Sequence, residues 1–213
     1  MSQFKIQNSK LKIGAVILGA GASSRMGRPK LLLPWGDTTV IGQILRQWRE
    51  LGAARIAVVQ RPDDAALAAE LERLNFPAQN RIENPQSGKG MFSSILCAAK
   101  WRGWHKDISN WAIVLGDQPH LRRETLRVLL EQAAQNVEAI CQPVFDGHPG
   151  HPVILPRNVF AELPRSRAET LKDFLRPFAG RCVQCPVADA GLLLDLDRPE
   201  DYDKAVKSRL GNL

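Results

Sequence analysis

Short runs of apolar residues alternate along the chain with longer stretches in which apolar positions recur at a helical period. The run from Ile13 to Leu18 is continuous and is followed by glycine, which is typical of a strand buried on both faces of a parallel sheet. Similar runs predict further strands at residues 55–60, 79–83 and 111–115, and the helical period predicts helices at residues 40–51, 64–74 and 91–101.

This alternation of strands and helices is the signature of right-handed βαβ units. We therefore expect an α/β fold, Rossmann-like, with a mainly parallel sheet between two layers of helices in a three-layer α/β/α arrangement. In such sheets, ligands bind outside the carboxyl ends of the strands. The loops after Leu18 and Leu115 are therefore the expected places for chemistry.

The second half of the chain is less regular. Residues 145–152, FDGHPGHP, are rich in turn-forming residues. Residues 1–10 are polar and aperiodic, which predicts a short flexible lead before the core begins at Leu11. Short apolar segments predict strands at residues 139–142, 153–155, 182–187 and 192–194, and helical patterns are found at residues 168–175 and 200–210.

Length and composition favour one domain over residues 11–213, because 213 residues with 44% hydrophobic content suffice for one substantial core. Four cysteines are few for this length, which excludes a disulfide scaffold and fits a reducing compartment. Cys182 and Cys185 have C-x-x-C spacing, and a zinc site could recruit them with His148 and His151. A lone pair without a second C-x-x-C is weak evidence for zinc, so we interpret them as two thiols on a strand.

We expect a cytoplasmic protein, because nothing resembles a signal peptide and no stretch approaches the ~20 apolar residues of a membrane span. A membrane is therefore not among the predicted partners. The net charge of +7 favours acidic partners, yet the Lys and Arg residues are scattered and form no basic block. A polyphosphate substrate suits this charge, and nucleic acid is not predicted as a partner.

The loop after the first strand is rich in glycine and predicts a phosphate site. Gly19, Gly21 and Gly27 permit backbone conformations closed to other residues, so that successive N–H groups can turn toward one anion. Arg25 and Lys30 add positive charge, the first as a fork of donors and the second as a point charge. We expect this loop to hold a triphosphate.

Two commoner phosphate motifs do not fit this loop. A Walker A loop needs Lys directly after its last glycine, whereas Arg28 and Pro29 intervene here. A dinucleotide fingerprint needs glycine at the position of Ser24 and an acidic residue at the end of the next strand, where Gln60 stands.

Carboxylates follow at places where they can act beside this loop. Asp117 comes just after a buried strand, at the predicted sheet edge of the glycine loop, although it could instead cap a helix that follows near Arg123. Asp195 and Asp197 alternate, so an extended strand would point both carboxylates to one face, which is costly unless a cation lies between them. The alternative for Asp197 is a cap on the last helix.

The sequence from Leu18 to Pro34, LGAGASSRMGRPKLLLP, closely resembles the signature of the molybdenum cofactor nucleotidyltransferases, L-A-A/G-G-x-S-x-R-M-G-x-x-K. Gly19 departs from it, since the family more often has Ala there. GDQP, from Gly116, resembles the family's G-D-x-P. DLDRPED, from Asp195, resembles D-I-D-T-P-E-D, with Arg198 in place of the usual Thr.

Two more segments carry the resemblance over nearly the whole chain, in the expected order. Residues 84–94, NPQSGKGMFSS, resemble the family's N-x-x-x-x-G-M-x-x-S, and residues 146–153, DGHPGHPV, resemble its G-x-x-G-H-P-V. Ser93 and Ser94 could equally be ordinary first-turn residues of a helix. His151 could equally be an ordinary surface histidine.

The resemblance implies a fold of the nucleotide-diphospho-sugar transferase type and a Mg²⁺ cofactor. Joining a nucleotide to a phosphate acceptor brings polyanions together, and Mg²⁺ with one or two carboxylates is suited to neutralise them. The implied residues are Arg25, Lys30 and Asp117 for catalysis; Leu18, Gly19, Ala20, Gly21, Ser23, Ser24, Gly27, Asn84, Gly90, Ser93 and Ser94 for the nucleotide; Gly150 and His151 for the acceptor; and Asp117 with Asp195 or Asp197 for the metal.

The implied reaction moves CMP from CTP to the phosphate of Mo-molybdopterin, giving the cytosine dinucleotide and pyrophosphate, with a molybdoenzyme as a possible recipient of the product. The choice of CTP depends on Ala20, because guanylyl-transferring relatives usually carry Gly-Gly where this chain has Ala20 and Gly21. The alternatives are a related guanylyltransferase, a nucleotidyltransferase for a sugar or polyol phosphate, and a non-catalytic carrier of the cofactor.

Overall fold

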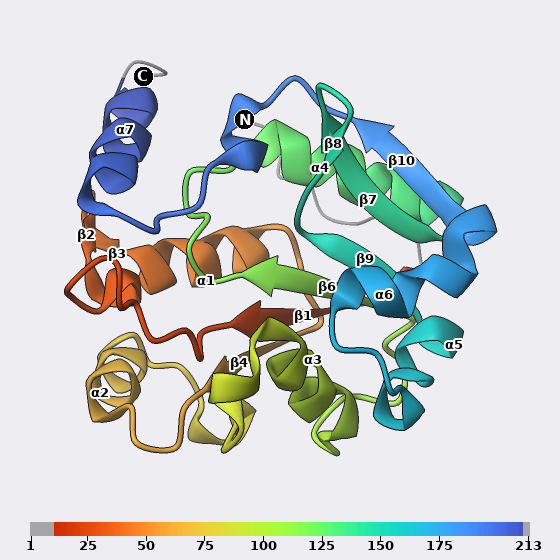
Figure 1. Ribbon diagram of the computed structural model, residues 1–213, viewed down its shortest axis with the longest axis horizontal. Coiled ribbons are helices and arrows are strands. Elements are labelled where there is room, and N and C mark those ends of the chain that lie inside the picture. Colours follow the sequence, from red (N-terminus) through yellow and green to blue (C-terminus); the bar gives the residue numbers. More distant parts are fainter. Residues whose placement is uncertain (1–10, 211–213) are drawn as a thin grey trace.

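The computed structural model describes residues 11–210, so the lead predicted at residues 1–10 lies outside the described part (Figure 1). One eight-stranded sheet forms its centre, and a separate two-stranded ribbon lies beside it. The strands of the large sheet are β1 (Ile13–Leu18), β4 (Arg55–Gln60), β5 (Arg81–Glu83), β6 (Asn110–Leu115), β7 (Ile140–Phe145), β8 (His148–Pro149), β9 (Val153–Pro156) and β10 (Cys182–Pro186), and those of the ribbon are β2 (Pro34–Trp35) and β3 (Thr38–Thr39).

The large sheet has the order β10-β7-β9-β6-β1-β4-β5, with β8 paired to β7. The part formed by the first strands of the chain is parallel: β1 pairs with β4 on one side and with β6 on the other, and β5 pairs with β4. Strand β9 runs antiparallel to β6 and β7, whereas β10 is parallel to β7. The sheet is therefore mixed and mainly parallel, as predicted.

Helices cover both faces of this sheet. They are α1 (Val40–Glu50), α2 (Ala65–Arg73), α3 (Met91–Lys100), α4 (Arg123–Gln135), α5 (Arg157–Phe160), α6 (Leu171–Leu175) and α7 (Pro199–Leu210). One hydrophobic core lies between the sheet and α1, α2 and α4, and a second lies between the sheet and α3, α5 and α6. These two cores are the physical basis of the predicted three layers, and the fold is Rossmann-like.

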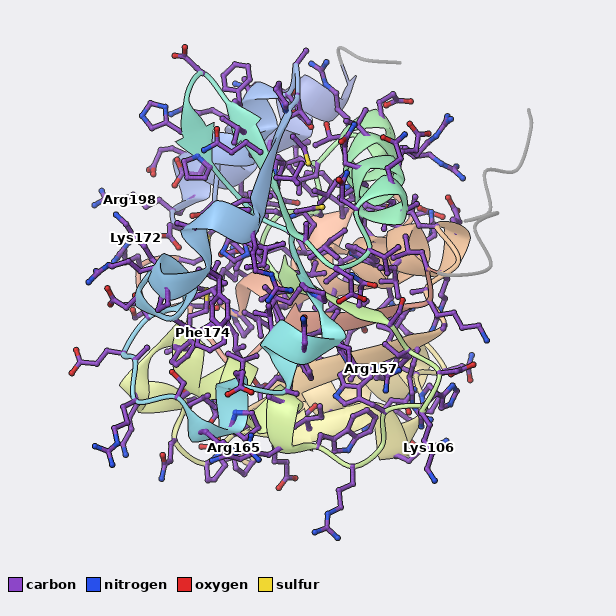
Figure 2. All side chains as sticks on the ribbon, turned by 90° about the vertical axis from the view of Figure 1, so that its right-hand side faces the viewer. Lys106, Arg157, Arg165, Lys172, Phe174 and Arg198 are labelled. Atoms are coloured by element: carbon purple, nitrogen blue, oxygen red, sulfur yellow. The ribbon has the colours of Figure 1, made fainter. Side chains whose placement is uncertain are left out.

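The second core and the last helix show how the outer elements are held. Figure 2 views the molecule from the side of α5 and α6, where Phe174 lies between α6 and α3 and Lys172 points outward. The ring of Phe174 packs 6.1 Å from that of Phe92 of α3, centroid to centroid. Helix α7 lies beside the ribbon (Figure 1), because Tyr202 donates a 2.5 Å hydrogen bond to the carbonyl of Pro34 and packs against Trp35.

Most elements agree with the sequence prediction to within three residues, and the strand predicted at residues 192–194 does not. Residues 192–194 are not a strand. Leu192 and Leu193 belong to a 3₁₀ turn, Ala190–Leu193, and Leu194 follows it, because the carboxylate of Asp189 accepts a 3.0 Å hydrogen bond from Gly191 N–H and starts a helical turn there. Helix α6 begins three residues later than predicted, because the Thr170 hydroxyl accepts a hydrogen bond from Asp173 N–H and caps the helix.

Three loops leave the carboxyl ends of neighbouring strands at the same level. Leu18 of β1 is in register with Leu115 of β6, and Gly116 N–H donates to the carbonyl of Leu18 at 3.1 Å. On the other side of β1, Gly19 N–H donates to the carbonyl of Val59 at 2.7 Å. The loops after β1, β4 and β6 therefore surround one point at the sheet edge.

No helix within residues 11–210 is long and apolar enough to cross a membrane.

Candidate active site

The glycine loop has the predicted position, but its glycines serve different purposes. Only Gly27 has a left-handed φ, of 70°, and the other left-handed residue of the loop is Ser23, with φ 51°. A Cβ on Gly19 would lie 3.1 Å from the carbonyl oxygen of Val59, so this glycine permits close packing against β4. A Cβ on Gly21 would meet no atom within 4 Å. The prediction that Gly19 and Gly21 also supply unusual backbone conformations was wrong.

Ser23 and Met26 fix the conformation of the glycine loop. The hydroxyl of Ser23 accepts a 3.2 Å hydrogen bond from Lys30 N–H, which joins the middle of the loop to its end. Met26 is buried and fixes the tip of the loop to the core beside α1 and β1. A 3₁₀ turn, Lys30–Leu32, follows, and it buries Leu31 while turning the Lys30 side chain to the sheet edge.

Two adjoining cavities open where the three loops meet. The first, called the central cavity, has a volume of about 340 Å³ and is bounded by the start of the glycine loop, the turn before α3 and the end of β6. The second, called the loop cavity, has about 370 Å³ and lies between the inside of the glycine loop and the start of α2. Together they form a continuous recess, since Lys30, Arg61 and four small or apolar loop residues line both.

Most of the residues predicted for a nucleotide line these cavities. Gly19 and Gly21 line both, and Lys30 lies between them. The further predicted residues are Leu18, Ala20, Gly90, Ser94 and Asp117 at the central cavity, and Ser23, Ser24 and Gly27 at the loop cavity.

Asn84 and Ser93 line neither cavity and instead shape the turn before α3. Asn84 is fully buried, and its amide donates to the hydroxyls of Ser93 and Ser94 at 2.8 and 2.9 Å. The hydroxyl of Ser93 donates back to the carbonyl of Gly90 at 2.7 Å. These bonds set the orientation of Gly90 and Ser94, so Asn84 acts on the central cavity through other residues.

The predicted carboxylates converge on Lys30. Its ammonium group forms ion pairs with Asp117 and, at 3.2 Å, with Asp197, and both Lys30 and Asp117 are 15% exposed. The second oxygen of Asp197 accepts a 2.7 Å bond from Arg25, whose side chain is mostly exposed. Residues separated by more than 160 positions thus form one charge cluster at the sheet edge.

Asp195 joins this cluster from a turn and not from a strand. Asp197 N–H donates to the carbonyl of Asp195 at 2.9 Å, which bends the chain around the buried Leu196. The carboxylate of Asp195 accepts a 2.9 Å bond from the amide of Gln118, next to Asp117. The extended strand from which both carboxylates were predicted to point to one face is absent from residues 194–198.

Neither capping alternative describes these aspartates. Helix α4 begins after Arg122 with no side-chain cap, so Asp117 caps nothing there. At the start of α7, the Arg198 N–H is bonded by the carboxylate of Asp201, at 3.1 Å. Asp201, and not Asp197, thus bonds the backbone at the start of α7, and Asp197 pairs with Lys30 and Arg25.

The charges of the cluster change the proton affinity of two of its members. Burial lowers the pKa of Lys30, but attraction and hydrogen bonding by Asp117 and Asp197 outweigh it, so the pKa lies above its ordinary value. Partial burial of the Asp195 carboxyl and repulsion by Asp117 raise the pKa of Asp195. An added cation would relieve the repulsion between these carboxylates.

The donor set of this cluster suits a hard divalent cation. Asp117 and Asp197 already share one cation, the Lys30 ammonium, and all candidate ligands are carboxylate oxygens. Magnesium is commonly held by one or two protein carboxylates, with phosphate oxygens and waters completing its shell. Over residues 11–210, no three Asp, Glu, His or Cys side chains form a ready-made metal site. The residues thus fit a metal that is completed by a phosphate ligand.

The residues predicted for an acceptor lie beside this cluster and outside both cavities. His151 is largely buried, and its Nδ1–H donates to the carbonyl of Ile113 at 3.2 Å. Burial lowers the pKa of His151, against the opposing influence of that hydrogen bond and of Asp117. Gly150 packs so closely that a Cβ would lie 2.5 Å from Leu192 Cγ. Both residues fix the loop between β8 and β9.

Sequence reasoning missed Arg61 and Ser87 as lining residues of the recess. Ser87 lines the central cavity from the turn before α3. Arg61 directly follows β4, so the rule that ligands bind at the carboxyl ends of strands was sufficient to find it.

Residues 15–184 match the family described as the MobA-like NTP transferase domain, which is well over half of the chain. The chain belongs to this family. It is 24% identical over 191 residues to the molybdenum cofactor cytidylyltransferase of Escherichia coli, covering 89% of this chain and 93% of that protein. It is 25% identical over 207 residues to the probable molybdenum cofactor guanylyltransferase of Bacillus mycoides, covering 92% and 96%.

The family likeness extends to solved structures. Rv0371c from Mycobacterium tuberculosis H37Rv has a TM-score of 0.72 and 25% identity, with 93% of this chain and all of that chain covered. A second structure of Rv0371c, described as a complex with manganese, has a TM-score of 0.68 over 92% of this chain and 99% of that chain. The family therefore supports a molybdenum cofactor nucleotidyltransferase-type activity, with relatives of the cytidylyl and the guanylyl kind at nearly equal identity.

Proposed function

We propose that this MobA-like domain transfers CMP from CTP to the terminal phosphate of Mo-molybdopterin and releases pyrophosphate. The observation that carries the proposal is the cluster in which Lys30 bridges Asp117 and Asp197, beside two cavities that share the glycine loop. In the reaction, an oxygen of the acceptor phosphate forms a bond to the α-phosphorus while the bond from that phosphorus to the pyrophosphate oxygen breaks.

The loop side chains bind and orient the triphosphate. Loop residues between Gly19 and Gly27 line the loop cavity, so their backbone is available to a bound triphosphate, and Lys30 lines the same cavity. Arg25 is exposed on the outer side of the cluster and offers a second cation to the phosphates. This is catalysis by positioning and charge neutralisation, and it needs no covalent enzyme intermediate.

Asp117, with Asp195 or Asp197, would hold Mg²⁺ once the triphosphate has entered. The cation would neutralise charge on the α-phosphate and the acceptor as they approach. Support comes from the oxygen-only donor set and from Rv0371c, which has been crystallised with manganese. Lys30, which pairs with Asp117 and Asp197, would also pair with the phosphates of a bound triphosphate.

The preference for CTP depends on Ala20. This residue is buried and lines the central cavity between Gly19 and Gly21, so its methyl group takes space beside the base. A pyrimidine needs less of that space than a purine does. We expect Ala20→Gly to raise the rate with GTP relative to CTP, and an unchanged ratio would reject this use of the methyl group.

The acceptor is proposed to approach beside Gly150 and His151, which lie next to the carboxylate cluster. Attraction to Asp117 opposes the burial that lowers the pKa of His151, which supports an acceptor position next to the cluster. A molybdoenzyme is the proposed recipient of the product. A sugar-phosphate or polyol-phosphate acceptor remains the alternative for the same chemistry, and a carrier that only binds the cofactor is the non-enzymatic alternative.

The test measures products with CTP, GTP, ATP and UTP, each with Mg²⁺ and Mo-molybdopterin. We expect pyrophosphate and the cytosine dinucleotide, with CTP the preferred substrate and no product after chelation of Mg²⁺. Preference for GTP would overturn the nucleotide assignment. Binding of Mo-molybdopterin without release of pyrophosphate from any nucleotide would favour the carrier.

A further inference from the structure

Arg61 occupies the junction of the two cavities. It follows β4 directly, and its side chain lines both the central cavity and the loop cavity. Six residues line both cavities, and of these only Lys30 and Arg61 carry a charge. An anion that extends from one cavity into the other therefore passes these two cations.

The hydrogen bonds of Arg61 leave much of its guanidinium group available. Its Nη2 donates to the carboxylate of Asp64 at 3.3 Å, and the side chain is 34% exposed. Its Nε is buried and has no hydrogen-bond partner among the described residues. A buried N–H without a partner is rare in folded proteins, because it loses its bond to water and gains nothing in return.

Asp64, the carboxylate that pairs with Arg61, also caps helix α2. Its other oxygen accepts a 3.1 Å bond from Leu67 N–H and caps α2. The Arg61 guanidinium thus pairs with the carboxylate that caps α2, and Arg61 also lines the recess. A guanidinium group offers five donors in a planar fork, which matches the oxygens of a phosphate.

We propose that Arg61 binds the triphosphate of the nucleotide at the junction of the cavities and holds the β- and γ-phosphates as they leave. The inference rests on the proposed function and adds a residue that the sequence motifs of the family do not contain. A contact to the base is the competing role, because a guanidinium also donates to carbonyl oxygens. The loop cavity favours phosphate, since the glycine loop, Ser23 and Lys30 line it together with Arg61.

The two roles differ in which part of the nucleotide they need. A phosphate contact strengthens binding of a triphosphate much more than binding of the matching monophosphate. A base contact strengthens binding of both equally. The comparison of CTP with CMP, and of GTP with GMP, therefore separates the roles whichever base the protein prefers.

The experiment is calorimetric titration of the full chain with CTP, CMP, GTP and GMP in the presence of Mg²⁺. For Arg61→Ala we expect affinity for the preferred triphosphate to fall on the order of tenfold or more, as for a lost charged hydrogen bond, with monophosphate affinity changed less than about twofold. Arg61→Lys keeps the charge but not the fork, so it should lose less.

Arg73→Ala is the matched control. Arg73 also forms an ion pair with a carboxylate three residues away, Glu70, but it lines neither cavity. Arg73→Ala removes the same charge as Arg61→Ala and should leave the affinities for CTP, CMP, GTP and GMP unchanged.

Failure of the role proposed for Arg61 and failure of the proposed function give different results. Equal loss of CTP and CMP binding, or no loss of triphosphate binding while Lys30→Ala does weaken it, would overturn the role of Arg61 alone. Absence of binding of CTP and GTP to the wild-type chain would overturn the proposed function itself. Equal effects of Arg61→Ala and Arg73→Ala would show that only net charge matters and would also overturn the assignment.

Discussion

Lys30 is the residue on which the electrostatics of the site depend. It pairs with two carboxylates and lines both cavities, so it can exchange a carboxylate for a phosphate without leaving its place. Its pKa above the ordinary value means that it stays protonated through the physiological range. A permanent cation at this point is what a polyphosphate ligand requires.

Lys30→Ala is predicted to weaken binding of the triphosphate about 10- to 100-fold, the loss typical of a charged hydrogen bond. The measurement is CTP titration at fixed Mg²⁺. Lys12→Ala is the control, because Lys12 also pairs with an aspartate, Asp107, but lies at the opposite end of β1. Unchanged affinity of the Lys30 variant for CTP would reject its assignment.

His151 predicts how stability depends on pH. Burial lowers its pKa in the folded chain, so the unfolded chain binds a proton more readily and gains it first as the pH falls below about 6.5. Stability contributed by neutral His151 is therefore present above that pH and is lost below it, by at most about 1.4 kcal/mol per pH unit.

Urea unfolding at pH 7.5 and pH 5.5 measures this effect. His151→Gln should reduce the loss of stability between the two pH values, whereas His105→Gln, at an exposed position, should not. An equal loss in the wild type and in His151→Gln would show that other groups cause the dependence.

For single residues, the sequence predicted which side chains gather at the sheet edge better than it predicted what each of them contacts. Arg25, Lys30, Asp117 and Asp197 do gather at one site, as the family motifs implied. Their pairing with one another was not foreseeable, because it joins residues far apart in sequence. Asn84 was expected at the nucleotide and is instead a buried scaffold for two serines, a role that depends on burial and not on residue type.

The strands β1 and β6 set the geometry of the site through their carboxyl ends. A Cβ on Gly116 would lie only 2.5 Å from the carbonyl oxygen of Leu18, so the two strand ends approach more closely than any other residue permits. Asp117 follows directly. The distance between the glycine loop and this carboxylate is therefore set by a glycine outside the charge cluster.

Gly116→Ala is predicted to push the strand ends apart, at a cost of about 1–3 kcal/mol in the free energy of unfolding, the range for overpacking. Turnover should fall further than the folded fraction does, because Asp117 moves. Gly180→Ala is the control, since a Cβ there meets no atom within 4 Å. Urea unfolding and initial rates measure both, and equal stability of the two variants would contradict this account of the strand ends.

Elements were predictable where local signals agreed with the hydrophobic period. Helix α1 begins at Thr39, whose hydroxyl caps it, and ends before Gly52, with its left-handed φ of 81°. Residues 190–198 were mispredicted, because Asp189 and the turn around Leu196 override an apolar sequence that resembles a strand. That override depends on contacts with the loop after β6, which sequence patterns do not contain.

The whole molecule was predictable to the level of layers and sheet edge. Alternating apolar runs indicated a mainly parallel sheet, and the register of Leu18 with Leu115 places the two predicted loops together. The antiparallel position of β9 between β6 and β7 was not predictable, because pattern alone does not give strand order. The recess formed at this edge is the feature from which the proposed activity follows.

The most direct test of the central claim is acceptor-dependent release of pyrophosphate, measured for the wild type and for Asp117→Asn with CTP, Mg²⁺ and Mo-molybdopterin. We predict release by the wild type and a loss of at least about 100-fold in Asp117→Asn at an equal folded fraction, because the role proposed for this carboxylate is to hold Mg²⁺ and not to stabilise the fold. Asp107→Asn, at an exposed ion pair, should retain full activity. Activity of Asp117→Asn in proportion to its folded fraction, or no release by the wild type, would contradict the account.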